Sequence, residues 1–199
     1  MKKIKRAIIS LSNKENLLYI LKTLNKYKIE IISSGGTYKE IKKLKYKCTE
    51  ISNYTKFSEI LDGRVKTLHP KIHAGILSKR KNKLHKKQLL KNKFKEIDLV
   101  IVNFYPFENI LKKTKNHLKI IENIDVGGPT MVRAAAKNYN DVTVITSSNQ
   151  YQELIEQLNN NRGCTSLDFR QKMSEEAFAE TGHYDCLIAN YFNKKSNNK

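Results

Sequence analysis

Residues 6–33, RAIISLSNKENLLYILKTLNKYKIEIIS, contain the pattern that decides the fold class. Two short runs within this stretch, 6–10 and 29–33, are rich in isoleucine, a residue that is enriched in strands. Between them, residues 16–27 repeat apolar side chains at helical spacing. A strand, a helix and a second strand in this order predict a βαβ unit, in which the two strands are parallel.

The same alternation continues along the chain. A Gly-Gly pair precedes a second helical stretch, 38–46, and the apolar run 98–107, DLVIVNFYPF, predicts a strand buried on both faces. Residues 141–147, DVTVITS, predict another such strand, and the amphipathic segment 148–160 follows it. We therefore expect an α/β fold with a parallel sheet covered on both sides, and ligands bound at the carboxyl ends of the strands.

Two further segments predict helices outside this alternation. The strongly basic segment 79–95 has only a modest apolar stripe, which predicts a solvated surface helix. The segment 166–192 places apolar residues at helical spacing, so this helix belongs either to the core or to a dimer face. These apolar residues are Phe169, Met173, Ala177, Leu187, Ile188 and Tyr191.

The length of 199 residues predicts one domain, which we place at 1–192. The remaining residues, 193–199, are polar and predict a tail or a linker. The three cysteines, Cys48, Cys164 and Cys186, lie far apart and form no CxxC pair. This spacing indicates neither a disulfide framework nor a thiolate metal site.

The charge and the hydropathy of the chain argue against two kinds of partner. Lys and Arg number 38 against 19 Asp and Glu, a net charge of +19, which is typical of nucleic-acid binding. The lysines are scattered, however, whereas proteins that read grooves gather arginines and aromatics, so we expect no nucleic-acid partner. No segment approaches the roughly 20 apolar residues of a membrane span, and the N-terminus lacks a secretory cleavage site. We therefore expect a soluble, cytoplasmic protein without a membrane partner.

Polar residues follow the first two predicted strands. The loop 33–37, SSGGT, stands between a strand and a helix, where free N–H groups and the helix dipole attract an anion such as phosphate. An ordinary turn, in which Ser34 or Thr37 caps the helix, remains the alternative. Ser10, Ser12 and Lys14 follow the first strand and add phosphate-compatible groups at the same sheet edge.

The segment 61–77, LDGRVKTLHPKIHAGIL, gathers Arg64, Lys66, Thr67 and His69. Pro70 excludes a regular helix through His69, so the two histidines of this segment are a poor match for a helical metal pair. Of Arg64 and Lys66, one would bind phosphate while the other faces a developing oxyanion; the alternative is that both are ordinary surface charges.

Two later segments add candidates. Residues 121–138, IENIDVGGPTMVRAAAKN, contain Asp125 before two glycines, and Lys137 after packed alanines that would reduce its solvation. A capped helix with solvent-facing cations is the alternative. Tyr105 precedes a proline at the end of the run 98–107 and either points its hydroxyl into the crevice or is a core aromatic.

Taken in order, KTLHPKIHAGIL, NFYPF and IDVGGPTMVRAAAKN resemble the signature segments of the IMP cyclohydrolase domain, the N-terminal, methylglyoxal-synthase-like domain of the bifunctional purine-biosynthesis enzyme. The resemblance extends from AIISLSNKENL to YDCLIANYF and so covers nearly the whole chain. It implies a three-layer α/β/α sandwich with a mostly parallel central sheet, a homodimer, and neither metal nor cofactor. The implied reaction closes a formylated aminoimidazole carboxamide ribotide to IMP with loss of water.

The resemblance also implies roles for particular residues. The implied phosphate-binding region falls on Ser10, Ser12, Lys14, Ser34, Gly35, Gly36, Thr37, Arg64 and Thr67. The implied catalytic group falls on Lys66, Tyr105, Asp125 and Lys137, and Asn103, Gly127 and Gly128 line the base. Lys66 and Tyr105 would stabilise the oxyanion, whereas Asp125 and Lys137 would transfer protons in an order that the sequence leaves open.

Other functions of the same fold remain as alternatives. A methylglyoxal synthase would need a carboxylate base where the matched positions hold lysines and a tyrosine. A non-catalytic nucleotide-sensing domain would keep the SGGT loop without needing Lys66, Tyr105 and Lys137 together. The full bifunctional enzyme also has a formyltransferase domain, which this chain lacks, so we expect that domain to be a covalent or a separate partner.

Overall fold

The computed structural model describes residues 1–196 of the chain. The central sheet has five strands in the order β4-β3-β2-β5-β6, and each neighbouring pair is parallel. The strands are β2 (Arg6–Leu11), β3 (Glu30–Ser33), β4 (Thr49–Glu50), β5 (Leu99–Asn103) and β6 (Thr143–Ile145). A second, antiparallel pair joins β1 (Lys2–Lys3) to β7 (Cys164–Thr165). The predicted parallel sheet is confirmed.

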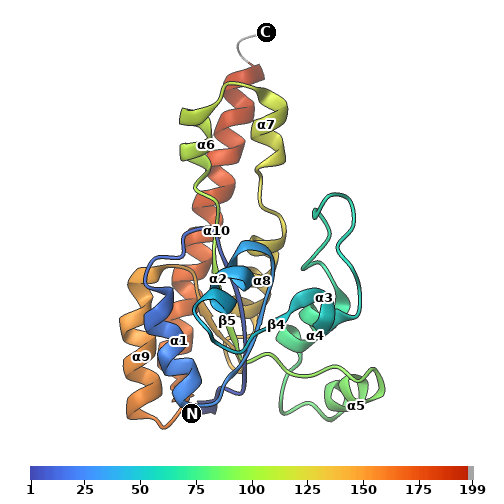
Figure 1. Ribbon diagram of the computed structural model, residues 1–199, viewed down its shortest axis with the longest axis vertical. Coiled ribbons are helices and arrows are strands. Elements are labelled where there is room, and N and C mark those ends of the chain that lie inside the picture. The colour runs from blue at the N-terminus through green and yellow to red at the C-terminus, as the bar shows by residue number, and fades with distance from the viewer. Residues whose placement is uncertain (197–199) are drawn as a thin grey trace.

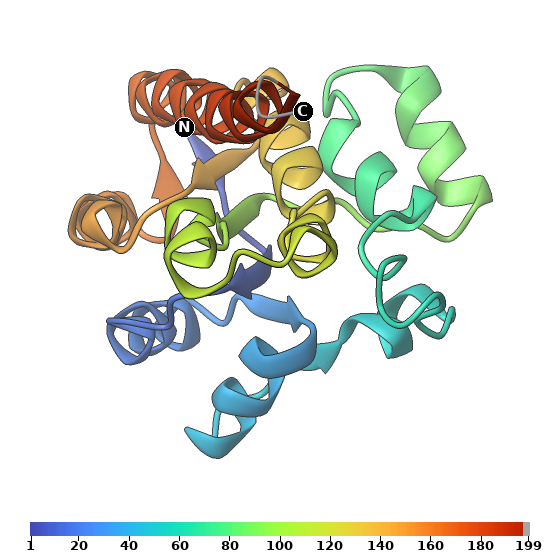
Figure 2. The ribbon, with the colours of Figure 1, turned by 90° about the horizontal axis from the view of Figure 1, so that it is seen from above.

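Helices cover both faces of this sheet. Helices α1 (Leu17–Lys26) and α9 (Tyr151–Asn160) contact each other on one face, and Figure 2 shows both on the side of the sheet opposite α4 (Pro70–Leu77) and α8 (Gly127–Lys137). The long helix α10 (Leu167–Ser196) packs against α8 and β6. The fold is therefore the three-layer α/β/α sandwich that the sequence predicts.

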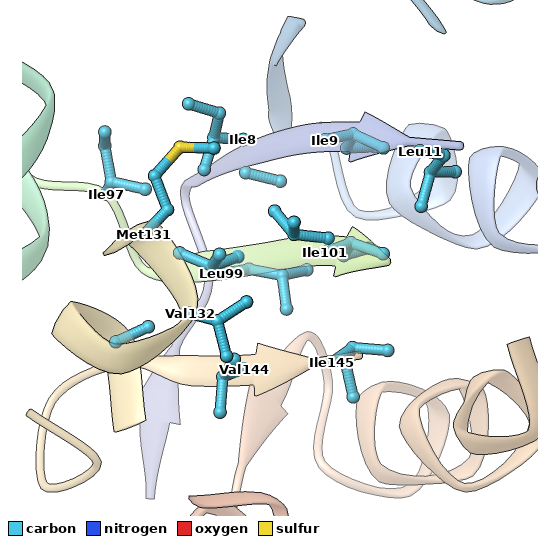
Figure 3. Packing of buried hydrophobic residues seen from close by; sticks show 14 of the residues in the cluster. Ile8, Ile9, Leu11, Ile97, Leu99, Ile101, Met131, Val132, Val144 and Ile145 are labelled. Atoms are coloured by element: carbon cyan, nitrogen blue, oxygen red, sulfur yellow. The ribbon is translucent and has the colours of Figure 1, made fainter. Parts of the chain in front are cut away.

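The core lies between the sheet and these helices. Ile8, Leu99 and Val144 are almost fully buried on neighbouring strands, and Met131 and Val132 of α8 pack onto them (Figure 3). Helices cover both faces of these strands, so their side chains are apolar on both faces. Helix α1 shows the same logic, since its buried residues recur three and four positions apart, which places them on one face.

Shorter helices connect the layers. They are α2 (Gly35–Lys43), α3 (Ile51–Thr55), α5 (Lys83–Lys91), α6 (Phe107–Lys113), α7 (His117–Glu122) and the 3₁₀ turn η1 (Ser148–Gln150). Within α5 only Leu89 is buried, as expected for a solvated surface helix. No helix in the described part of the chain is long and apolar enough to span a membrane.

Helix α10 divides into two parts. Its first half supplies Phe169, Met173 and Ala177 to the core of the body. Its second half leaves the body and contacts α6, and with α6 and α7 it forms a projection that we call the arm (Figure 1). The helix continues to Ser196 and so includes the first part of the predicted tail, 193–199, whereas 197–199 lie outside the described residues.

Candidate active site

The strand order places a crevice between β2 and β5. The chain leaves β2 towards β3 and leaves β5 towards β6, on the other side, so the loops after these two neighbouring strands diverge. Asn103, at the end of β5, bridges this divergence: its Oδ1 accepts from Ser12 N at 2.7 Å and Asn13 N at 3.1 Å, and its Nδ2 donates to Asn13 O at 2.7 Å. Asn103 therefore holds the two strand ends in register at the mouth of the crevice.

The start of α2 lies beside the end of β2. Thr37 Oγ1 accepts from Leu11 N at 2.9 Å and donates to Leu11 O at 3.0 Å, so this buried hydroxyl locks the helix onto the strand. Ser34 at the N-cap makes no side-chain cap hydrogen bond, and Gly35 follows in the left-handed region with φ of 54°. The first N–H groups of α2 thus face the strand edge without a capping side chain, as an anion site requires.

Two ammonium groups flank this helix start. A Cβ atom on Gly36 would lie 3.7 Å from Lys14 Nζ, and one on Gly35 would lie 3.7 Å from Lys66 Nζ. These distances join the residues that follow β2 to the segment 61–77, which is remote in sequence. The helix dipole and the two ammonium groups act together on the same space, so this space favours an anion.

Lys66 and Arg64 reach the site on the loop 57–68. Residues Ile60 and Val65 form an antiparallel bridge that closes the tip of this loop. Just outside the bridge, Lys66 Nζ pairs with Glu59 Oε2 at 2.5 Å. Arg64 pairs with Glu122 at the end of α7, a residue of the arm. Both predicted cations therefore have carboxylate partners that the sequence analysis did not single out.

Asp125 lies at the start of α8. Its Oδ1 accepts from Gly128 N at 2.9 Å, and its own N–H donates to Tyr184 Oη at 2.8 Å. Burial raises the pKa of the Asp125 carboxyl, although the N–H groups of Gly128 and Gly127 oppose this shift. The predicted capping role and a raised proton affinity thus coexist in one carboxylate, which suits a group that must accept a proton.

The glycines after Asp125 allow close packing. A Cβ atom on Gly127 would collide with Thr67 Oγ1, and one on Gly128 would collide with the Asp125 carboxylate. Thr67 is itself 9% exposed, so its hydroxyl is held against the start of α8. The segment 61–77 is thereby joined to Asp125 as well as to α2.

Tyr105 follows β5 and is 55% exposed, so it is not a core aromatic. With Ser12 it lines a cavity of about 440 Å³ whose opposite wall belongs to α6 and α7 of the arm. Lys119 and Glu122 are among the arm residues that line it. The residue missed by sequence reasoning is Glu122, and no spacing signal in the sequence distinguishes it from the other surface glutamates.

Lys137 is the predicted catalytic residue that the fold does not bring to this place. It is an exposed residue in the last turn of α8, ten positions after Gly127, which corresponds to about 15 Å along the helix axis. The next residue, Asn138, donates to Ser78 O, beyond the far end of α4. Within one chain, Lys137 therefore lies at the edge of the sheet opposite the site.

The two histidines of the segment 61–77 have structural surroundings. His69 Nδ1 accepts from Lys71 N at 3.0 Å and so caps α4, with Pro70 at the first helical position. His73 lies one turn further along α4, half-buried, and burial lowers the pKa of its imidazole. Among residues 1–196, no group of three or more His, Cys, Asp or Glu side chains is arranged to hold a metal ion.

Comparison with known proteins identifies relatives of this chain. Residues 135–199 match a family described as the AICARFT/IMPCHase bienzyme. The bifunctional purine biosynthesis protein PurH of Clostridioides difficile (strain 630) is 48% identical over 188 residues, which are 94% of this chain and 36% of that protein. PurH of Prochlorococcus marinus (strain MIT 9515) is 46% identical over 190 residues, 95% of this chain and 36% of that protein. The chain thus spans little more than a third of the length of these relatives.

A solved structure has the same architecture. The chain in a crystal structure of ForH superposes with a TM-score of 0.85 at 27% identity, and the match covers 95% of this chain and 97% of that one. Residues 16–130, which carry β3, β5 and the loop 57–68, match the MGS-like domain family. Because this match covers more than half of the sequence and the sheet has the expected parallel order, the chain belongs to the MGS-like domain family.

Proposed function

We propose that this chain is an IMP cyclohydrolase, which closes 5-formamidoimidazole-4-carboxamide ribotide to IMP with loss of water. The observation that carries the proposal is the meeting of an uncapped helix start, Lys14 and Lys66 at the carboxyl edge of the sheet. Tyr105 follows β5 at the same edge, and Asp125 precedes α8, whose Gly127 packs against Thr67. The relatives named as bifunctional purine biosynthesis proteins support the same reaction.

In the proposed complex the phosphate binds at the first turn of α2. The N–H groups there and the Lys14 ammonium neutralise it, and Ser10 and Ser12 border the same strand end. Binding at this point directs the imidazole towards Lys66, Tyr105 and Asp125. The substrate carries both reacting groups on one ring, so anchoring it supplies much of the required proximity.

The proposed chemistry has two steps. The carboxamide nitrogen attacks the formyl carbon and loses a proton to Asp125, while Lys66 and the Tyr105 hydroxyl donate hydrogen bonds to the formyl oxygen as it gains charge. The oxyanion then takes up a proton to become a hydroxyl. This hydroxyl takes up a second proton and leaves as water, while the former formamido nitrogen loses its proton and forms the carbon–nitrogen double bond of the closed ring. The raised pKa of Asp125 favours its part, because a carboxylate that binds protons more readily is the stronger base.

Lys137 enters this proposal only through a second copy of the chain. The resemblance to IMP cyclohydrolases implies a homodimer, and Lys137 is exposed at the far end of α8. We propose a homodimer in which Lys137 of one protomer reaches the site of its partner and protonates the leaving oxygen. Within a single protomer, Lys66 or the Tyr105 hydroxyl would have to protonate the leaving oxygen instead.

The setting of the enzyme follows from the same comparison. The relatives are bifunctional and much longer, so we propose that a formyltransferase domain supplies the formylated ribotide, either fused to this chain or as a separate protein. We also propose a cytoplasmic location, because both reactions act on soluble nucleotides. The cyclohydrolase domain itself is proposed to comprise residues 1–192.

The direct test is a spectrophotometric assay of IMP formation from the formylated ribotide by the purified chain. Lys66→Ala and Tyr105→Phe are each expected to lower kcat by roughly 10²- to 10³-fold, the usual effect of removing an oxyanion donor. Tyr105→Phe should change nucleotide affinity little, whereas Lys66→Ala should also weaken it, because the Lys66 ammonium flanks the phosphate site at the start of α2. Lys26→Ala is the matched control, because Lys26 is exposed at the end of α1 that lies away from the site. Among the described residues, its ammonium contacts only Asn159 Oδ1 and the Tyr27 ring.

Two outcomes would contradict the proposal. Near-normal turnover in both variants would remove Lys66 and Tyr105 from the catalytic group. Tight binding of IMP by the wild-type chain without any turnover would instead indicate a nucleotide-sensing domain of the same fold.

A further inference from the structure

The ion pair between Arg64 and Glu122 joins two segments that are 58 residues apart. Arg64 Nε donates to Glu122 Oε1 at 3.1 Å, and Arg64 Nη2 donates to Glu122 Oε2. Two parallel hydrogen bonds of this kind fix the plane of the guanidinium as well as its position. A contact of this geometry constrains the loop 57–68 relative to the arm.

This pair contributes little to the stability of the fold. The Arg64 and Glu122 side chains are 63% and 55% exposed, and exposed pairs add little to the free energy of unfolding. The hydrogen bonds from Arg64 lower the pKa of the Glu122 carboxyl, and those to Glu122 raise the pKa of Arg64, so both groups stay charged at neutral pH. The effect of the pair is therefore to be sought in the position of Arg64.

The tip of the loop, residues 60–65, has few other attachments. Ile60 and Leu61 are 45% and 65% exposed, so their apolar side chains do not anchor it. Leu61, Asp62 and Gly63 all have positive φ, which two non-glycine residues adopt at some cost. Within the described residues, the Arg64–Glu122 pair is the one polar interaction that joins this tip to another element.

The pair also borders the site. Glu122 lines the cavity of about 440 Å³ that contains Ser12 and Tyr105. Two residues after Arg64, Lys66 stands 3.7 Å from the position of a Cβ atom on Gly35. A displacement of the loop tip would therefore move Arg64. It would also shift Lys66, because the two residues are joined by a short stretch of backbone. Figure 1 shows this loop projecting from the body, with α7 in the arm above it.

We propose that Glu122 is a positioning residue for the cyclohydrolase reaction. Its carboxylate holds Arg64 at the edge of the cavity, where the guanidinium meets the anionic ribotide, and it fixes the loop 57–68 against the arm. This inference rests on the proposed function, and it adds a residue that neither the sequence nor the resemblance to IMP cyclohydrolases singled out. Glu122 itself touches no reacting atom.

The kinetic test compares Glu122→Gln with the wild-type chain. We expect a KM for the formylated ribotide about fivefold higher, in line with the upper end of the coupling found for exposed ion pairs, and an almost unchanged kcat. The rise should be absent when Glu122→Gln is made in an Arg64→Gln background, because the partner is already missing. Glu122→Asp keeps the carboxylate on a shorter side chain, so its KM should lie between those of the wild-type chain and Glu122→Gln. Glu153→Gln breaks another exposed pair, that with Lys172, and serves as the matched control.

Each alternative result would overturn the inference. A lower KM in Glu122→Gln would mean that the carboxylate competes with the substrate for Arg64. An unchanged KM would mean that the pair has no influence on binding, and an equal rise in the Arg64→Gln background would mean that Glu122 acts through some other group.

A second measurement separates this inference from the proposed function. Amide hydrogen exchange of residues 57–68 should accelerate several-fold in Glu122→Gln but not in Glu153→Gln, whether or not the chain turns over the ribotide. A wild-type chain that makes no IMP would contradict the cyclohydrolase proposal while leaving this measurement valid. Unchanged exchange in the loop would contradict the positioning role even in an active enzyme.

Discussion

At the scale of single residues, the chain contains two carboxylates whose surroundings shift their pKa in opposite directions, Asp125 in the site and Asp141 outside it. Asp125 is buried beside the start of α8, and burial raises its pKa more than two N–H groups lower it. Burial also raises the pKa of Asp141, but the Lys2 ammonium at 2.5 Å and the Arg80 N–H at 3.0 Å outweigh it, so that the pKa of Asp141 is lowered overall. Removing the charge of Asp125 should therefore raise the free energy of unfolding, whereas removing the charge of Asp141 should lower it.

We predict that Asp125→Asn stabilises the protein at neutral pH while it abolishes cyclisation. A raised pKa means that protonated Asp125 favours folding, and this contribution is lost as the pH rises through the folded-state pKa. Asparagine keeps the acceptor for Gly128 N–H without the charge. The gain in the free energy of unfolding should be present at pH 7 and absent near about pH 3, below the ordinary aspartate pKa.

Urea unfolding at several pH values measures this effect. Asp141→Asn is the control with the opposite sign, because a lowered pKa contributes stability above the ordinary aspartate pKa that disappears as the pH falls. Asp141→Asn should therefore be less stable than the wild-type chain at pH 7. Equal losses of stability in both variants at pH 7 would show that burial does not govern Asp125.

Sequence reasoning located several of these residues without deciding between their roles. It left Thr37 open between phosphate ligand and helix cap, because either role needs the same residue type at the same place, and it judged His69 a poor match for a metal pair. The structure shows that the Thr37 hydroxyl is hydrogen-bonded to the Leu11 backbone and that His69 caps α4. The partner of Thr37 is 26 residues away, so no local pattern contains it, whereas the contact of His69 is local to the start of α4.

At the scale of elements, the long helices and the buried strands were predictable because their periodicity is strong. The segments 6–33 and 141–160 give the strands and helices that their apolar spacing predicts. The arm was not predicted, because α6 and α7 are only seven and six residues long and each buries few side chains. The loop 57–68 owes its shape to one bridge and three residues of positive φ, which apolar spacing does not encode.

Two glycines inside helices should respond oppositely to replacement by alanine. A Cβ atom on Gly75, within α4, would lie 2.7 Å from the backbone oxygen of Lys95, whereas one on Gly182, within α10, would meet nothing within 4 Å. Alanine gains up to about 1 kcal/mol over glycine in a helix, so Gly182→Ala should raise the free energy of unfolding by up to that amount. Overpacking costs about 1–3 kcal/mol, so Gly75→Ala should lower it.

Denaturant unfolding of both variants checks this pair of expectations. The same substitution in the same kind of element isolates the packing of Gly75 against the backbone that leads into β5. A Gly75→Ala variant as stable as Gly182→Ala would mean that α4 and the segment before β5 separate easily.

At the scale of the whole molecule, the parallel sheet gathers the site from four stretches of sequence. The strand order brings the ends of β2, β3 and β5 to one edge, and the start of α8 reaches the same edge. The loop 57–68 joins them through Lys66 and Thr67, which lie beside Gly35 and Gly127. The same order explains why Lys137 departs from the group. Helix α8 starts at that edge and runs back towards the beginning of β6, so a residue in its last turn lies at the other edge. Sequence spacing shows that Lys137 belongs to α8 but not in which direction α8 runs.

A homodimer in which Lys137 serves the partner's site makes a prediction that a single-chain mechanism does not. Lys137→Ala and Lys66→Ala should each be inactive alone, yet mixing the two after dissociation should restore about one quarter of wild-type turnover. Random reassembly of a two-subunit complex makes half of the dimers mixed, and one of the two sites in each mixed dimer then has both lysines.

Kinetic assays of the mixture against each variant alone make the comparison. An affinity tag on one variant shows that exchange has occurred when the untagged variant co-purifies with it. If Lys137 acted within its own protomer, each site of a mixed dimer would keep one defect and no activity would return. If Lys137 took no part, Lys137→Ala would be active before mixing. Complementation is thus the result that a site divided between two protomers requires, given that α8 separates Lys137 from Gly127 by about 15 Å in one chain.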